Sequence, residues 1–313
     1  MKKIIITSIC CSTILTSCQQ TEDFDNEILP ISIEASIEGN HHTSRHAGDG
    51  NTLNNLDFKQ GDAIGMFVNE QAVVEWSKQS NSEWKASNTI YWPNKFNEHN
   101  FYAYHPYIEA SSKESVPMPS LSNQTGNIED LCAFDFLVAT TKQSYETSAT
   151  VSFTGEDNGF QHVSSLISIT IKGNSDLKSS TINNISFEGE NIASSTTYSF
   201  ISKEISITSN GISNKLSSSA LNHTMNNTDK TFYFIVNAGK ELSDITINIE
   251  YSTGNTNYTA SKRGLGNATL ISGNLYKFNL NIIDGILGIT GNTIQPWTEQ
   301  TMDDIIINTP TKQ

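Results

Sequence analysis

Arginine is almost absent from this sequence. Only Arg45 and Arg263 occur among its 313 residues, and the formal net charge is -14. Proteins that bind nucleic acid or anionic lipid head groups need a basic surface, because these ligands are polyanions. The composition therefore disfavours both kinds of ligand, and we expect no nucleic-acid partner.

Cysteine is also scarce. Three of the four cysteines, Cys10, Cys11 and Cys18, lie close to the N-terminus. Cys10 and Cys11 belong to an expected leader peptide, and Cys18 is expected to carry a lipid. Because Cys132 is then the last cysteine left in the mature chain, no intrachain disulfide is predicted.

Catalytic motifs are missing as well. The sequence has no Gly-x-Ser-x-Gly, no His-Glu-x-x-His and no phosphate-binding loop. His41, His42 and His46 with Asp49 form a weak metal-ligand grouping, and Asp49-Gly50-Asn51 departs from the calcium-loop pattern. A solvated loop explains both groupings, so we predict no cofactor and no enzymatic activity. Two carboxylates far apart in the sequence can still meet in the fold and hydrolyse a glycoside. A surface glycoside hydrolase therefore remains an alternative, ranked after two non-enzymatic functions given below.

Four tryptophans are the largest side chains of the sequence. They suit either a sugar-binding platform or the core, and core positions are the more usual place for such residues. The four are Trp76, Trp84, Trp92 and Trp297.

The first 17 residues have the build of a secretory signal peptide. Lys2 and Lys3 precede an apolar run, Ile4 to Leu15, that is too short to span a bilayer. The following Leu15-Thr16-Ser17-Cys18 resembles a bacterial lipobox, at which a diacylglycerol is attached to the cysteine thiol and the signal is cut before it. We therefore predict a signal peptide over residues 1–17 and lipidation of Cys18. No later stretch is apolar enough to cross a membrane, so the lipid would be the only anchor.

The mature chain is expected to begin with a tether and one well-marked strand. Residues 18–28 are polar and acidic, which suits a solvated linker or a short signal for surface export. In the segment 29–38 every odd position is apolar, which predicts a strand with one buried face. Residues 39–55 are polar and rich in His, Gly and Asn, so they are expected to form an exposed loop around Arg45. The buried positions of the strand are Leu29, Ile31, Ile33, Ala35 and Ile37.

The rest of the chain reads as many short strands. Ser, Thr and Asn alternate with apolar residues between turn signals, and no segment makes a convincing amphipathic helix. This pattern predicts an all-β fold of antiparallel sandwiches. The length suits two of them, and the turn cluster Gly173-Asn174-Ser175-Asp176 is the best boundary. We expect an N-terminal sandwich over residues 29–173 and a C-terminal sandwich over residues 174–313.

Several pieces of the sequence, taken in order, resemble the fimbrillin family, the type V pilins and related lipoproteins of Gram-negative anaerobes. The pieces are the lipobox, the first strand with Thr43-Ser44-Arg45, Phe58–Gly65, Ile90–Pro93, Phe101–Tyr107, Asp135–Ala139, Phe160-Gln161-His162, Ser272–Phe278 and Ile294–Trp297.

The resemblance implies two tandem transthyretin-like or immunoglobulin-like β-sandwiches and a lipoprotein precursor carried to the outer membrane. In polymerising members, an Arg-specific protease cuts in the loop after the first strand. Here Arg45 fits that site and His46 would become the new N-terminus, with Arg263 as a competing site. Loss of the first strand would open a groove that a neighbour's C-terminal segment fills.

Physical chemistry supports that scheme. A sandwich that lacks an edge strand exposes unpaired backbone groups beside an apolar slot, and an added strand satisfies both. Such a contact is head-to-tail and therefore extends into a filament. Within the expected donor segment 298–313, Asp304 to Asn308 would place Ile305 and Ile307 in the slot. The same stretch also suits an ordinary last strand of its own domain.

The sequence thus predicts a non-catalytic structural and adhesive subunit of surface fimbriae, whose partners are other fimbrial subunits. The alternative is a non-polymerising outer-membrane lipoprotein that stays anchored through Cys18 and binds a glycan or a host protein.

Overall fold

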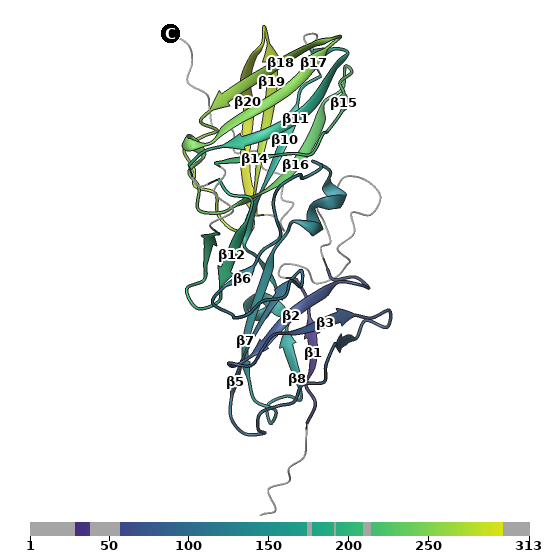
Figure 1. The fold of residues 1–313 in the computed structure, drawn as a ribbon, viewed down its shortest axis with the longest axis vertical. Coiled ribbons are helices and arrows are strands. Elements are labelled where there is room, and N and C mark those ends of the chain that lie inside the picture. The colour runs from purple at the N-terminus through teal and green to yellow at the C-terminus, as the bar shows by residue number, and fades with distance from the viewer. Residues whose placement is uncertain (1–28, 38–56, 174–176, 191, 209–213, 297–313) are drawn as a thin grey trace, which may run out of the picture.

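The computed structural model describes residues 29–37, 57–173, 177–190, 192–208 and 214–296. The leader, the tether, the loop 39–55 and the segment 298–313 lie outside the described residues. The described part is elongated, with two strand-rich units arranged end to end (Figure 1). Within it the longest α-helix is the four-residue α1 (Gly155–Asn158), and no helix is long and apolar enough to cross a membrane. The prediction of an all-β fold is confirmed.

The N-terminal unit has two layers. One layer is an antiparallel six-stranded sheet in the order β4-β3-β2-β5-β7-β9, and the other contains the parallel pair β1-β8. The elements are β1 (Ser32–Ala35), β2 (Ala63–Val68), β3 (Val74–Lys78), β4 (Trp84–Ala86), β5 (His99–His105), β7 (Leu137–Gln143), β8 (Thr150–Phe153) and β9 (Gln161–His162).

Aromatic side chains fill the space between these layers. Trp76, Trp84 and Trp92 are all buried in this core, so the prediction of core tryptophans is confirmed for the three that the structure describes. Phe58 packs edge-on against Trp84, with ring centroids 5.2 Å apart. Large rings let short strands bury enough apolar area to hold the two layers together.

The C-terminal unit is a sandwich of a four-stranded sheet, β16-β10-β19-β20, and a second sheet, β14-β11-β17-β18, in which β15 also pairs with β11. Phe187 and Phe234 meet across its core with ring centroids 5.4 Å apart. The elements are β10 (Ser164–Ile171), β11 (Ser180–Glu188), β14 (Lys215–Ser217), β15 (His223–Thr224), β16 (Lys230–Asn237), β17 (Thr246–Thr253), β18 (Thr256–Arg263), β19 (Asn274–Ile283) and β20 (Ile286–Pro296), with the 3-10 helix η3 (Leu242–Asp244).

The expected domain boundary at residue 173 falls inside this second set of strands. β10 precedes Gly173, yet it pairs with β16 and β19 and its apolar residues belong to the C-terminal core. Gly173 lies instead where the backbone of Thr228 comes so close that an added Cβ would meet its carbonyl oxygen at 2.5 Å. Turn-forming residues mark tight turns, and they do so within a sandwich as well as between two.

A small third sheet joins the two units. It pairs β6 (Val116–Pro117) with β12 (Thr196–Ser199), which forms a hairpin with β13 (Glu204–Ile207), and the order is β13-β12-β6. The hairpin packs on the six-stranded sheet, where the Phe200 ring lies 5.5 Å from that of Tyr102. The 3-10 helix η1 (Ile128–Ala133) lies in the same connection, and its Leu131 enters the C-terminal core. The six-stranded sheet is therefore covered on one face by β1 and β8 and on the other by residues of the second half of the chain.

Candidate functional site

The first strand is held from one side by β8. The two strands are parallel, with Ser32 opposite Thr150 and Ala35 opposite Phe153 (Figure 1). The amide of Ser36 donates to the carbonyl of Phe153 over 3.0 Å, which continues the ladder beyond β1.

A second segment holds the first strand from its other side. The amide of Ile31 donates to the carbonyl of Ile90, and the amide of Trp92 donates to the carbonyl of Leu29, each over 2.9 Å. Pro30 and Tyr91 form an antiparallel bridge between these bonds. In the described residues this second neighbour is bonded only to the start of the segment, at Leu29 and Ile31, and β1 itself is an edge strand of the two-stranded sheet β1-β8, as the sequence led us to expect. Sheet neighbours cannot be read from one strand's own pattern, because the alternation reports only the buried face.

The side chains of the first strand alternate as predicted. Ile31 and Ile33 are each 7% exposed, Ala35 is 9% exposed and Ile37 is 1% exposed, whereas Ser32 and Glu34 face solvent. Leu29 is half-buried against the same core. Burying an isoleucine side chain contributes about 1.5–3 kcal/mol, so these residues anchor the strand strongly.

The space that the strand occupies has apolar walls. Val151 and Phe153 on β8 are the cross-strand neighbours of Ile33 and Ala35, and Phe160 forms a bridge with Ile37. All three are fully buried, and the rings of Phe153 and Phe160 meet at 5.9 Å. At the far end, the amide of Phe160 donates to the carbonyl of Ser36 over 2.9 Å. Without residues 29–37 the N-terminal unit would expose these side chains beside the unpaired backbone edge of β8, and the backbone groups of Ile90 and Trp92 would also lose their partners. We refer to this space as the first-strand slot.

The other predicted site residues lie outside the described residues. These are the lipidation site Cys18, the processing site Arg45 and His46, and the donor residues Ile305 and Ile307. His41, His42 and Asp49 lie outside them too. Among the residues that the structure does describe, no group of three or more side chains could hold a metal ion.

His162 has a structural role. It lies on β9, and its Nδ1 is 3.0 Å from an oxygen of the buried carboxyl group of Asp135. Both side chains are buried where β7 and β9 meet the start of the C-terminal unit. The contact between these two buried polar groups fixes the local packing.

Tyr104 and Gly65 show how tightly the six-stranded sheet packs on the face that lies away from the slot. The Tyr104 hydroxyl donates to the carbonyl of Ile108 over 2.6 Å, and burial raises the pKa of this hydroxyl far above its usual value. A Cβ at Gly65 would lie 2.3 Å from the Tyr104 ring. Only glycine lets the ring lie across β2 in this way.

Comparison with known proteins gives the following matches. A family model described as fimbrillin-like matches residues 48–297. The structure of a candidate cell adhesion protein from Bacteroides uniformis has 16% sequence identity and a TM-score of 0.55, and the match covers 86% of this chain and 99% of that one. A candidate cell adhesion protein from Bacteroides ovatus has 17% identity and a TM-score of 0.53, with 88% and 99% covered. At identities this low, the structural likeness shows a shared fold and nothing more. A search of curated proteins finds no match to the sequence.

Proposed function

The chain belongs to the fimbrillin-like family, and we propose that it is a non-catalytic structural and adhesive subunit of cell-surface fimbriae. In this proposal it is exported as a lipoprotein precursor through the lipid on Cys18, reaches the outer membrane, and joins other fimbrial subunits after cleavage at Arg45.

The first-strand slot is the observation that carries this proposal. The strand that fills it has only nine described residues, 29–37, and the next described residue is Asp57. Its buried side chains all point to one face, and its backbone bonds run to β8 and to Ile90–Trp92. A cut in the intervening loop would leave this strand attached to the body of the molecule by non-covalent contacts alone.

Removal of residues 18–45 would turn the slot into an acceptor. Its apolar walls and the free backbone edge of β8 would favour uptake of another extended segment by β-augmentation. Because donor and acceptor are different parts of one subunit, the contact repeats head-to-tail and builds a filament.

The donor in this proposal is the neighbour's segment from Asp304 to Asn308. Ile305 and Ile307 have the two-residue spacing of Ile31 and Ile33, which are buried in the slot. A strand with this period places both isoleucines on one face. A donor with two apolar residues matches half of the four positions that are buried between Ile31 and Ile37, so the neighbouring residues of the donor would contribute mainly backbone hydrogen bonds.

Analysis of the N-terminus of the surface protein tests this proposal. We expect material that starts at His46, together with ladders on gels of unboiled surface preparations. Arg45→Gln should abolish both, whereas Arg263→Gln, at the competing site, should leave them unchanged. If all of the material keeps a lipid on Cys18, the processing model is wrong, and the alternative of a permanently anchored surface lipoprotein that binds a glycan or a host protein takes its place.

A further inference from the structure

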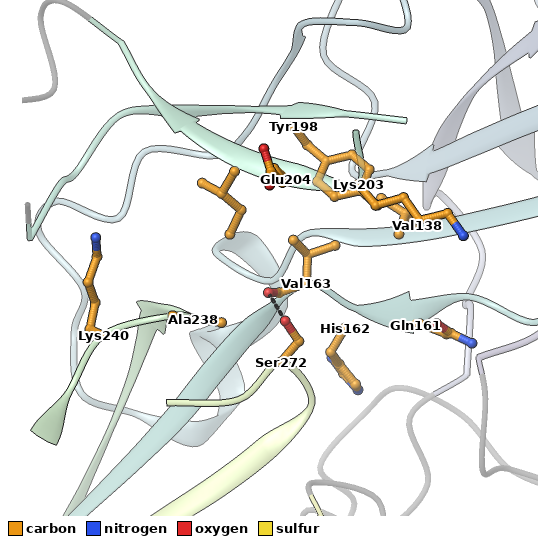
Figure 2. A pocket seen from close by; sticks show the side chains of 12 residues that line it. Val138, Gln161, His162, Val163, Tyr198, Lys203, Glu204, Ala238, Lys240 and Ser272 are labelled. Carbon is orange, nitrogen blue, oxygen red and sulfur yellow. Dashed lines mark hydrogen bonds between the residues drawn. The ribbon is translucent and has the colours of Figure 1, made fainter. Parts of the chain in front are cut away.

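A pocket of about 560 Å³ opens where the two units meet. It receives residues from the end of β7, from β9, from the β12–β13 hairpin and from two loops of the C-terminal unit. The hydroxyl of Ser272 donates to the carbonyl of Val163 over 2.7 Å and joins two of its walls (Figure 2). We call this space the junction pocket.

The junction pocket has an apolar interior and cationic sides. Val138, Val163 and Ile205 line it together with the ring of Tyr198. Figure 2 shows Lys240 on one side of it and Lys203 with Glu204 on the other.

Lys203 and Lys240 can each bind an acidic partner. Neither Lys203 nor Lys240 forms an ion pair or a side-chain hydrogen bond with any residue in the described ranges. Lys172 and Lys215, by contrast, pair with Asp229 and Glu188. In a chain with a formal net charge of -14, a pocket with two such lysines attracts an acidic segment and not a basic one.

One wall of the junction pocket is an open strand edge. β13 is the outer strand of the order β13-β12-β6. Ile205 and Ile207 on β13 are only half-buried, although they alternate with the exposed Glu204 and Ser206. An extended segment added beside β13 would complete both its hydrogen bonding and the burial of these isoleucines.

The described chain ends close to this pocket. Pro296, the last residue of β20, is paired with Asn274 on β19, and Ser272 of the pocket lies two residues before Asn274. Cross-strand and along-chain spacings place the Cα of Pro296 within roughly 13 Å of that of Ser272. A few residues of extended chain are enough to enter the pocket from this point.

We propose that the segment 297–307 of the same chain docks in the junction pocket. Glu299, Asp303 and Asp304 supply the acidic groups that Lys203 and Lys240 attract, and Ile305 and Ile307 supply a strand face for the apolar interior beside β13. The docking is independent of strand exchange between subunits. In a polymerising subunit it would hold the segment before a neighbour takes it up.

Hydrogen exchange of the intact, unprocessed chain tests this proposal. With an effective concentration on the order of 1 mM for a tethered segment, an intrinsic dissociation constant of ~0.1 mM would slow exchange at a docked edge about tenfold. We expect that protection in β13, and we expect it to disappear in a chain that ends at Trp297 and in Lys203→Glu/Lys240→Glu. The matched control, Lys85→Glu/Lys277→Glu, makes the same change of net charge at exposed sites on β4 and β19 and should leave the protection in place.

Two results would overturn the proposal. One is equal exchange of β13 in the intact and truncated chains. The other is protection that rises with protein concentration, because it would assign the pocket to the segment of a second copy. Since no cleavage at Arg45 is involved, neither result bears on whether the first-strand slot accepts a donor.

Discussion

The two β-rich units of this molecule differ in the length of their strands and in how paired strands are connected. In the N-terminal unit, the four-residue β1 pairs in parallel with β8, and Ser32 contacts Thr150 across 118 positions of the sequence. In the C-terminal unit, strands of eight to eleven residues are joined by tight turns in the β17–β18 and β19–β20 hairpins. Its one parallel pair, β10 with β19, has β16 and β20 on its outer sides.

In the proposed assembly this difference would separate a strand that is replaced from a core that stays intact. A short strand from the start of the chain can leave without breaking any other strand pair of its unit, although the apolar side chains it covered then need a new cover. A hairpin strand cannot leave alone, because its turn ties it to its neighbour. The N-terminal unit is thus suited to exchange of a strand and the C-terminal unit to serve as a fixed support.

Truncation of one phenylalanine in each unit gives the largest expected effect. Phe153→Ala removes a buried ring beside the slot, and Phe187→Ala opens the C-terminal core beside Phe234. Each change should lower the free energy of unfolding of its own unit by about 3–5 kcal/mol, because it leaves a large cavity. Hydrogen exchange resolved by strand measures the two units separately. Equal loss of protection in both units from either variant would show that they unfold as one.

Substitution within the first strand should have the next largest effect. Ile33→Ala should lower the free energy of unfolding of the N-terminal unit by about 2–4 kcal/mol, with faster exchange in β8 and unchanged exchange in β19. The exposed neighbour provides the control, since Glu34→Gln should change stability by less than about 0.5 kcal/mol. An equal effect of the two substitutions would contradict the burial of alternate side chains in the slot.

Gln124 tests how the connection between the units is fastened to the C-terminal sheet. Its buried side chain donates to the carbonyl of Ile235 over 2.8 Å and accepts from the amide of Ile235 over 2.7 Å. Gln124→Leu should cost about 1–3 kcal/mol, because it leaves both backbone groups buried without this partner. Denaturant unfolding measures the loss, and exchange of the Ile235 amide should accelerate. Gln71→Leu, at an exposed position, serves as the control.

The smallest expected effect is a pH dependence confined to the C-terminal unit. Burial, and then the charge of Lys230, lower the pKa of His223 below its usual value of 6.5. The His223 imidazole therefore binds a proton more readily in the unfolded chain than in the folded one. Neutral His223 does not lower the stability above pH 6.5, and the free energy of unfolding declines as the pH falls below that value. Thermal unfolding at acidic and neutral pH should show a smaller difference for His223→Gln than for the unsubstituted protein. An unchanged difference would exclude His223 as the source.

The alternation of residues 29–37 predicted its buried face correctly, because a strand has a period of two and apolar side chains favour the core. Strand content and core tryptophans followed from local composition in the same way. The boundary near Gly173 was wrong, since the same residue types make turns inside a sandwich and between sandwiches. β10 is therefore grouped with the second unit by its partners, β16 and β19, and not by the turn that follows it.

By itself, the sequence determined the class of fold and the inward face of the first strand, because both depend on the order of apolar and polar residues along the chain. The tertiary structure alone decided that this strand pairs in parallel with β8 and that the residues before it bond to the Ile90–Trp92 segment. It also decided that the β12–β13 hairpin and β9 meet around the junction pocket. Backbone hydrogen bonds do not depend on side-chain identity, so the choice among possible strand partners is made by the packing of the whole molecule.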